Sequence, residues 1–234
     1  MDDTSEAARQ KRAAEVRRAE ALRENLRRRK EQGRARAPRR AIGGLPTDAV
    51  LDFWFGPVDD AERGQFRKCW FEKNAAYDAE IAQRFAAAVE TAMTGAWTAG
   101  IADVRDALAL LILLDQFPRN IFRGTARAFA GDSIARALAD RAVGAGWDGT
   151  VAPVERIFIY LPFEHSEDLA DQDRSVALFS SLPETPWRAM ALDYAERHRD
   201  VIRRFGRFPH RNGALGRNST ADERAYLATP GSGF

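Results

Sequence analysis

Side chains that exchange protons or bind anions are concentrated in three short stretches of a sequence that otherwise has the character of a protein core. The first stretch, residues 113–124, follows an apolar run and contains Asp115, Gln116, Arg119, Asn120 and Arg123. A carboxylate at the end of a buried helix costs free energy unless it is paired. We therefore expect Asp115 to pair with Arg119 or Arg123, either within a ligand site or as a salt bridge that holds the helix end.

The second stretch, residues 161–172, places a histidine among acidic residues. Its polar residues include Glu164, His165, Glu167 and Asp168. Because the reference pKa of histidine is near neutrality, His165 is a candidate proton carrier or ligand group. The structural alternative is that a helix starts here, where its dipole stabilises acidic side chains.

The third stretch, residues 203–217, combines arginines with turn-forming glycine and proline. It contributes Arg207, His210, Arg211, Asn212 and Arg217. Guanidinium groups on turns bind carboxylates or phosphates through paired hydrogen bonds. The lysine and the glycine spacing of a P-loop are missing. The FPRN of the first stretch returns here as FPHRN, so the two turns either face one cavity or are alike by chance.

The three histidines of the chain do not predict a metal site. No two of them have ligand spacing on a helix, and a single cysteine excludes a multi-cysteine zinc site. We therefore expect neither a metal nor a cofactor. His198 lies on an apolar helix face, which is typical of a hydrogen-bonded core histidine. Cys69 has no base beside it in the sequence and is expected to be a buried structural thiol.

The elements that must position these side chains are predicted to be helices throughout. Apolar residues recur at helical spacing within residues 47–55, 77–93, 103–117, 132–142, 153–161, 169–179 and 187–205, and Thr220 and Glu223 form a capping box for a last helix. We expect Thr47 to cap the first helix, and Pro118 and Pro162 to end the third and the fifth. Residues 151–160 are the best strand candidate, which Pro153 weakens. An all-α fold follows.

The positive charge of the chain lies at its start. Residues 1–40 contain 12 arginines and 2 lysines against 7 acidic residues, whereas the whole chain has a net charge of +2. Residues 6–32 predict a basic helix, and a linker follows it. We expect residues 1–40 to form a basic arm and residues 45–234 to form the helical domain. The arm either binds RNA or a partner protein or is simply a solvated helix.

Length and composition exclude several classes of protein. A chain of 234 residues can bury a full core without disulfides. The charged start is unlike a secretory signal, and the longest apolar run, residues 107–114, is too short to cross a bilayer. We expect a cytoplasmic protein with no membrane contact.

The three polar stretches, together with VLDFWFG at 50–56, resemble a known family. LLDQFPRNIFRGTARAFAGD at 113–132, LPFEHSEDLADQ at 161–172 and FGRFPHRNGALGR at 205–217 are similar to the bacterial domain of unknown function catalogued as number 924. The resemblance covers about residues 46–234. It implies a tetratricopeptide-like array of helix hairpins packed into a curved body, and it implies no activity. The matching residues are those named in the three stretches, together with Gln172.

Two functions suit these residues. In the first, the stretches line a cleft that binds an anionic small molecule or a peptide through its arginines. In the second, a hydrolase or transferase uses His165 or His210 as general acid or base in the same cleft, with Glu164 or Asp115 orienting the ring. The structural alternative is that the same charges only fasten the helices together.

Overall fold

The computed structural model describes residues 43–60 and 62–232, and in this part of the chain the fold is all-helical, as predicted. The predicted basic arm, residues 1–40, lies outside the described residues. Within the described residues, no helix has the length and apolar character needed to cross a membrane.

The helices follow the predicted order along the chain. They are α2 (Thr47–Phe55), α3 (Ala75–Met93), α4 (Val104–Leu111), α5 (Phe117–Ile121), α6 (Asp132–Gly144), α7 (Pro153–Glu164), α8 (Leu169–Ser180), α9 (Arg188–Phe205) and α10 (Ala221–Leu227). The strand candidate at 151–160 forms the start of α7 instead, with Pro153 as its first residue. Proline suits this position because the N–H it lacks would have no partner there.

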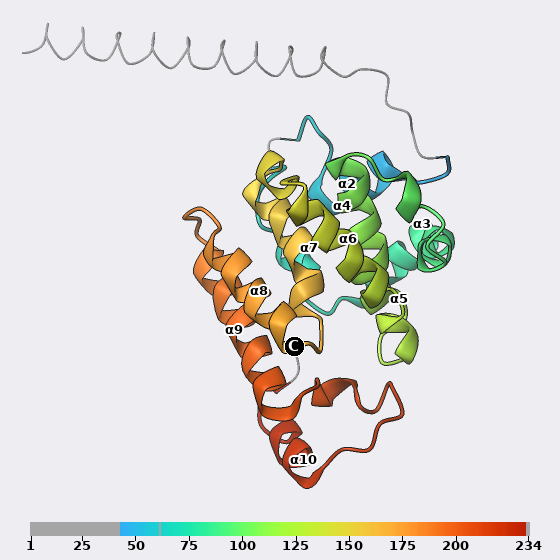
Figure 1. Ribbon diagram of the computed structural model, residues 1–234. Coiled ribbons are helices and arrows are strands. Elements are labelled where there is room, and N and C mark those ends of the chain that lie inside the picture. The colour runs from blue at the N-terminus through green and yellow to red at the C-terminus, as the bar shows by residue number, and fades with distance from the viewer. Residues whose placement is uncertain (1–42, 61, 233–234) are drawn as a thin grey trace, which may run out of the picture. The chain divides into compact units, whose positions relative to one another are not determined.

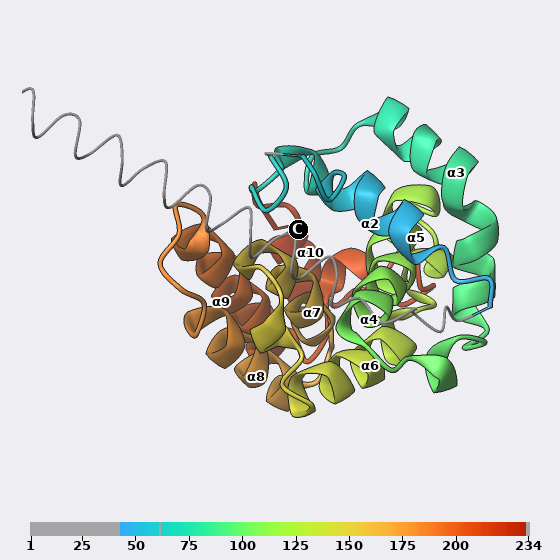
Figure 2. The ribbon, with the colours of Figure 1, turned by 90° about the horizontal axis from the view of Figure 1, so that it is seen from above.

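From α6 to α9, helices that are adjacent in the chain are also adjacent in space. Helices α6, α7, α8 and α9 pack in order, α4 packs against α2, α6 and α7, and α3 packs against α5 (Figures 1 and 2). Helix α10 lies beyond the end of α9, after a long connecting segment (Figure 1). This order is compatible with packed helix hairpins. The tetratricopeptide-like arrangement itself stays a prediction.

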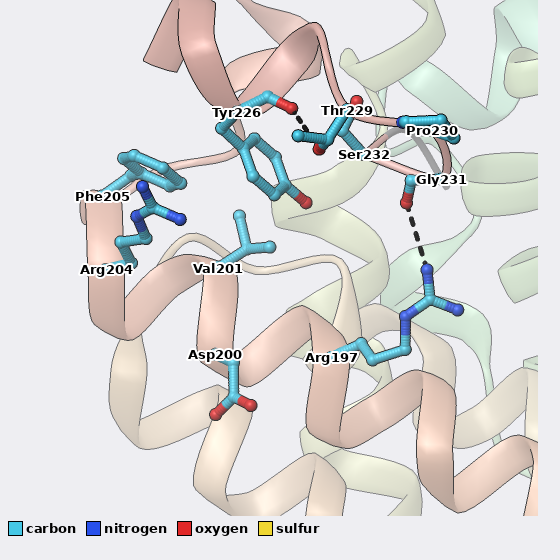
Figure 3. Close-up of a pocket in the computed structure, with 10 residues that line it drawn as sticks. All are labelled: Arg197, Asp200, Val201, Arg204, Phe205, Tyr226, Thr229, Pro230, Gly231 and Ser232. Atoms are coloured by element: carbon cyan, nitrogen blue, oxygen red, sulfur yellow. Dashed lines mark hydrogen bonds between the residues drawn. The ribbon is translucent and has the colours of Figure 1, made fainter. Parts of the chain in front are cut away.

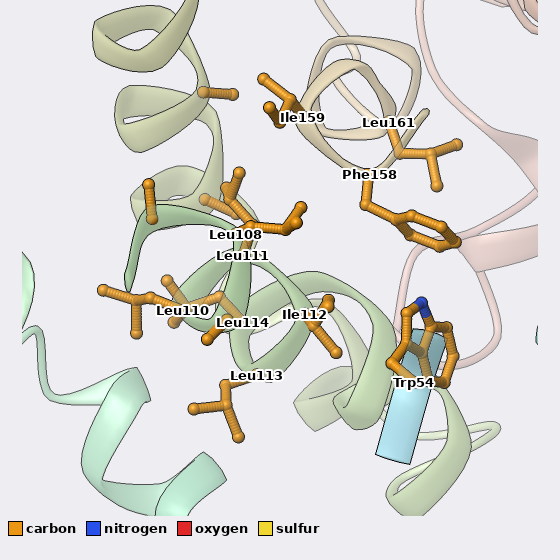
Figure 4. Packing of buried hydrophobic residues seen from close by; sticks show 14 of the residues in the cluster. Trp54, Leu108, Leu110, Leu111, Ile112, Leu113, Leu114, Phe158, Ile159 and Leu161 are labelled. Atoms are coloured by element: carbon orange, nitrogen blue, oxygen red, sulfur yellow. The ribbon is translucent and has the colours of Figure 1, made fainter. Parts of the chain in front are cut away.

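The centre of the core is the apolar run that begins in α4. Residues 107–114 are all buried, and they lie among side chains of α7 such as Phe158 and Ile159 and near Trp54 of α2 (Figure 4). A helix that is apolar on nearly every side is stable only when other elements surround it. Each large apolar side chain buried here contributes about 1.5–3 kcal/mol. This packing fixes the end of the run, where the first polar stretch begins.

The helical conformation continues through Pro118 to Ile121, so the prediction that this proline ends the helix is wrong. A single π-helical turn, Ile112–Gln116, joins α4 to α5, and the N–H of Phe117 donates to the carbonyl of Ile112. Pro118 then falls in the first turn of α5, a position at which helices tolerate a residue without an N–H. The wider turn thus lets the chain remain helical to Ile121. Such π turns are frequent at functional sites.

A close backbone contact sets the position of α6 against this turn. Gly131 precedes α6, and a methyl group on its Cα would overlap the carbonyl oxygen of Leu114 in the π-helical turn. Only glycine lets the two backbones approach this closely. The first residue of α6, Asp132, is therefore held near Asp115.

Other predicted helix ends also need correction. Pro162 lies inside α7, which ends at Glu164. The proline removes one backbone hydrogen bond, but it does so near the helix end and among buried side chains that keep this segment packed. Thr47 is the first residue of α2 and not its cap, because its hydroxyl donates to Asp106 at 2.6 Å. The Thr220–Glu223 capping box is confirmed.

Some predicted core residues are less buried than expected. Met190 and Tyr194 belong to the predicted apolar face of α9, but 42% of each is exposed. Cys69 is only half-buried. His198 of α9 is buried, as its position on an apolar helix face predicted.

Candidate ligand site

The three polar stretches meet in space. Asp115 comes from the π-helical turn, His165 directly follows α7, and Arg211 belongs to the short helical turn Pro209–Arg211 after α9. Together with nearby side chains they form one group, which we call the polar cluster: Asp115, Arg119, Asp132, Glu164, His165, His198, His210 and Arg211.

Asp115 and His165 form the closest pair in the cluster. His165 Nδ1 lies 2.7 Å from Asp115 Oδ1. The second oxygen of Asp115 accepts from the Gln116 amide at 2.5 Å, and Arg119 Nη1 lies 3.2 Å from Oδ1. Burial opposes ionisation of this carboxyl, but the charge of Arg119 and the contact with His165 outweigh it and lower the pKa of Asp115. Asp115 is therefore an ionised, buried carboxylate.

His165 is a neutral imidazole at neutral pH. Burial and the charge of Arg119 lower its pKa, while Asp115 partly opposes them. Because the Asp115 carboxylate only accepts hydrogen bonds, the ring proton lies on Nδ1 and the lone pair on Nε2. The side chain remains 13% exposed. A base oriented in this way can take a proton from a bound molecule.

A second carboxyl–imidazole pair lies behind the first. Glu164 Oε1 lies 3.2 Å from His198 Nδ1, which also lies 2.8 Å from the Tyr194 carbonyl. Burial, and then the charge of Asp115, raise the pKa of Glu164 to about 8, so this carboxyl is protonated at neutral pH. Burial, and then His165, lower the pKa of His198 well below its usual value.

The helix start expected within the second stretch is observed, but Glu164 does not belong to it. Glu164 ends α7, and the next helix, α8, starts after Asp168. Asp168 caps α8 by accepting from the N–H groups of Ala170 and Asp171. The structural alternative therefore accounts for Asp168 but not for Glu164, which the dipole of its own helix disfavours as an anion.

Asp132 joins the two arginines of the cluster. Arg119 donates to both oxygens of Asp132 at 2.9 and 3.0 Å, and Arg211 Nη1 donates to Oδ2 at 3.3 Å. Arg119 Nη1 also donates to the Asp115 carbonyl at 2.6 Å, so this guanidinium has several close acceptors. Asp115 was expected to pair with Arg119 or Arg123, and in the structure it pairs with Arg119.

Arg211 is buried with few hydrogen bonds. Only 7% of its side chain is exposed, and its guanidinium lies 4.6 Å and 4.5 Å from the ring centres of Phe129 and Phe208. Among the described residues, the bond to Asp132 is the single hydrogen bond of the guanidinium, and its buried Nε has no hydrogen-bond partner. Burial, and then the charge of Arg119, lower the pKa of Arg211 to about 10.

His210 precedes Arg211 in the same turn. Burial, and then the charge of Arg211, lower the pKa of His210 to about 4. Its ring centre lies 5.4 Å from that of Phe208. This histidine is therefore neutral at pH 7, and a neighbouring cation keeps it so.

An ion pair attaches the third stretch to the second. Arg217 donates to both oxygens of Glu167 at 2.7 and 3.0 Å, and Glu167 also accepts from the Phe208 N–H at 2.8 Å. These contacts hold the segment that contains His210 and Arg211 against the end of α7. The predicted site residues Glu167 and Arg217 thus position the cluster from its edge.

The other predicted site residues bind elsewhere. Asn120 and Arg123 both donate to Asp78 of α3. Arg207 and Asn212 both donate to Glu223 of α10. Their observed contacts attach helices to one another, which is the structural alternative for these residues.

Two hollows among the described residues lie away from the polar cluster. One cavity of about 280 Å³ lies between α9 and the segment after α10, lined by residues that include Arg197, Val201 and Tyr226 (Figure 3). Another, of about 330 Å³, is lined by residues of α6 and Thr98. In the described part of the chain, no group of three or more histidine, cysteine or acidic side chains is placed to hold a metal ion. The predicted cleft stays a prediction.

Two residues of the cluster region were missed in the sequence. Asp132 was expected only to open a helix, and Phe129 was not singled out. Both residues contact Arg211, which lies about 80 positions later in the chain. Asp132 and Arg211, for example, are 79 residues apart. No local pattern marks such contacts. The similar turns FPRN and FPHRN were the available signal, because Arg119 and Arg211 bind the same carboxylate.

Comparison with known proteins gives relatives without a described activity. The model of a bacterial protein family of unknown function, DUF924, matches residues 50–231. A protein of unknown function from Agrobacterium tumefaciens has a similar solved structure, with 42% sequence identity and a TM-score of 0.67, over 78% of this chain and 96% of that one. No curated protein matches the chain.

Proposed function

The chain belongs to the bacterial protein family of unknown function DUF924, and from the polar cluster we propose that it binds a small anion at Arg211. The observation that supports this is a buried guanidinium whose single hydrogen bond, among the described residues, is the 3.3 Å bond to Asp132. A guanidinium has five N–H donors and binds carboxylates and phosphates with two of them. The ligand is thus a phosphorylated or carboxylated compound or a peptide terminus.

Arg119 provides the contrast within the same cluster. It makes two short bonds to Asp132 and a further contact with Asp115, as expected for a guanidinium that serves only to fasten elements together. Arg211 has no comparable partner set, although its burial is costly unless its donors are paired. A bound anion would supply the missing acceptors.

A thermal-shift experiment tests the anion site. The full chain is heated with phosphate, sugar phosphates, nucleotides or carboxylates, and a ligand at a hundred times its Kd is expected to stabilise it by about 2.7 kcal/mol. For a domain of this size the melting temperature then rises by roughly 5–11 °C, because each kcal/mol shifts it by about 2–4 °C. The Arg211→Gln variant is expected to lose the shift, because the guanidinium is gone.

The matched control is Arg203→Gln, which removes a half-exposed arginine of α9 that pairs with Asp173. It should retain the full shift. If no anion shifts the wild-type protein and Arg211→Gln simply melts at a lower temperature, the cluster is a structural network and the proposal is wrong.

A second function is favoured by the 2.7 Å contact between His165 and Asp115. In a hydrolase or transferase, Nε2 of His165 would take a proton from water or a hydroxyl group while Asp115 fixes the ring. The arginines would stabilise the negative charge that develops on the substrate. Glu164, which is protonated at neutral pH, and His210 are the remaining candidates for proton transfer.

Nitrogen NMR of the histidine rings tests this second function. At pH 7, His165 is expected to be neutral with its proton on Nδ1, and Asp115→Asn is expected to lower its pKa further because a supporting charge is lost. Asp140→Asn, which changes a half-exposed aspartate of α6, should leave the His165 signals unchanged. A proton on Nε2 in the wild-type protein contradicts the assignment of His165 as the base.

A further inference from the structure

A second candidate site is the cavity of about 280 Å³ between α9 and the segment after α10 (Figure 3). One wall is α9, with Val201 and Arg204, and the other comprises Tyr226 and residues 229–232. Among its described lining residues, none belongs to the polar cluster. Because pockets for drug-sized molecules measure about 300–1,000 Å³, a molecule bound in this cavity would be small.

Hydrogen bonds hold the wall formed by residues 229–232 in place. Arg197 of α9 donates to the Gly231 carbonyl at 3.1 Å (Figure 3). The Thr229 hydroxyl donates to the carbonyl of Tyr226 at 2.6 Å. The segment after α10 is thus attached both to α9 and to α10 itself. The cavity is therefore formed before a ligand binds, as most small-molecule sites are.

Arg204 contributes a guanidinium that is held by aromatic rings. Its Cζ lies 4.7 Å from the ring centre of Phe205 and 5.9 Å from that of Tyr226. Among the described residues, it makes no hydrogen bond and no ion pair. Contacts with ring faces hold a guanidinium without using its N–H donors. The donors of Arg204 are therefore available to an anion in the cavity.

The other arginines of α9 all have an acceptor within the protein. The pairs are Arg188 with Glu184, Arg199 and Arg203 with Asp173, and Arg197 with the Gly231 carbonyl. Asp200, which also lines the cavity, lies 3.7 Å from Arg203 Nη1. Arg204 thus differs from its neighbours on the helix, whose guanidinium groups serve to hold the fold together.

Tyr226 supplies a flat apolar surface and a hydroxyl group. Its ring centre lies 5.1 Å from that of Phe205, and its side chain is partly exposed. In Figure 3 its hydroxyl points toward the space between Val201 and Gly231. Aromatic rings pack favourably against other rings in stacked or edge-to-face arrangements. A flat ring in a ligand would thus have a partner close to the Arg204 donors.

From these contacts we propose that the cavity binds a small aromatic acid, with its anionic group on Arg204 and its ring against Tyr226 and Val201. This site is separate from the anion site at Arg211 and does not depend on it. A guanidinium binds a carboxylate through two parallel hydrogen bonds. Since burial of the ring makes a second, apolar contribution, neither half of the molecule alone should bind as tightly.

Three probes separate the two halves of the ligand. Benzoate has both the charge and the ring, acetate has only the charge, and benzamide has only the ring. Each is titrated into the full chain labelled with nitrogen-15, and the amide signals of Gly231 and Ser232 report binding at this cavity. Benzoate is expected to shift them in a saturable way. Acetate is expected to bind about tenfold more weakly because no ring is buried, and benzamide about fivefold more weakly because the charge is missing.

Arg204→Gln removes an exposed guanidinium and is expected to weaken benzoate binding about fivefold. The matched control is Arg203→Gln, at the adjacent arginine that pairs with Asp173, and it should bind benzoate as the wild-type protein does. Arg211→Gln should also keep the shifts at Gly231, because the two sites are separate. An otherwise unchanged amide spectrum shows that each variant is folded.

The proposal is overturned if benzoate does not shift the signals of Gly231 and Ser232. Equal affinity for benzoate and acetate, or for benzoate and benzamide, also overturns it, because one half of the ligand would then play no part. Undiminished benzoate binding in Arg204→Gln contradicts the role of that guanidinium. Loss of the Gly231 shifts in Arg211→Gln would place benzoate in the polar cluster, which overturns this site but supports the one at Arg211.

Discussion

Glu164 shows how burial decides the ionisation of a single residue. Its carboxyl lies at the end of α7, near the ionised Asp115, and its pKa is raised to about 8 from an ordinary 4.5. The folded protein therefore keeps a proton that the unfolded chain loses above pH 4.5. By linkage, this residue makes the folded state less stable as the pH rises toward 8.

The stability of the protein is expected to fall between pH 6.5 and pH 8. The lowered histidine pKa values favour unfolding only below pH 6.5, so Glu164 dominates above it. The span of 1.5 pH units corresponds to about 2 kcal/mol of unfolding free energy. Urea denaturation at both pH values measures this loss.

The variant Glu164→Gln mimics the protonated carboxyl and is expected to abolish the loss. Glu184→Gln, at a side chain that is 88% exposed, is the control and should behave as the wild-type protein does. Equal unfolding free energies of the wild-type protein at pH 6.5 and pH 8 would contradict the assignment.

At the scale of elements, the ion pair between Glu167 and Arg217 attaches the segment after α9 to the end of α7. It is two-pronged and partly buried, and Glu167 also binds the Phe208 N–H. Losing it is expected to cost about 1 kcal/mol locally. His210 and Arg211 follow Phe208 after a single proline, so this attachment sets their position in the cluster.

Hydrogen exchange measures that attachment. In Glu167→Gln the Phe208 amide is expected to exchange roughly fivefold faster, which corresponds to about 1 kcal/mol. Amides of α4, which lie in the central core, should keep their rates. An unchanged rate at Phe208 would show that other contacts hold the segment.

The π-helical turn explains why sequence patterns located elements better than their ends. Apolar spacing predicted the run that ends in Asp115, but propensity alone favours a stop at Pro118. The extra residue of the turn, and the packing of Ile112–Leu114 in the core, keep the chain helical past that proline. Pro162 in α7 was misjudged for the same reason, since tertiary packing outweighed a local rule.

At the scale of the whole molecule, the residues that bind in the polar cluster all lie after residue 110, whereas the basic charge lies in residues 1–40. We propose that the arm and the helical domain act separately. A chain that starts at residue 41 is expected to bind anions with unchanged Kd and to lose any RNA retention that falls with rising salt. Gel filtration with and without RNA, beside the thermal-shift assay, measures both properties. Loss of anion binding on truncation would contradict this separation.

The residues of the candidate site could be predicted because their types and spacing are visible in short stretches of sequence. Their contacts could not, because the partners lie far apart along the chain. The three polar stretches and the Asp115–Arg119 pair were visible in the sequence. That Asn120 and Arg123 turn to α3, and Arg207 and Asn212 to α10, depends on which helices pack beside them. The Glu164–His198 pair lies 34 residues apart on two helices, and no spacing rule joins them.

The glycine before α6 has a consequence for redesign of the protein. Because Gly131 brings two backbones into contact, the separation between Asp115 and Asp132 is set by main chain and not by side-chain packing. The two carboxylates are therefore expected to keep their positions when the arginines and histidines around them are replaced. An engineer can vary them to change ligand preference, provided that position 131 keeps its glycine.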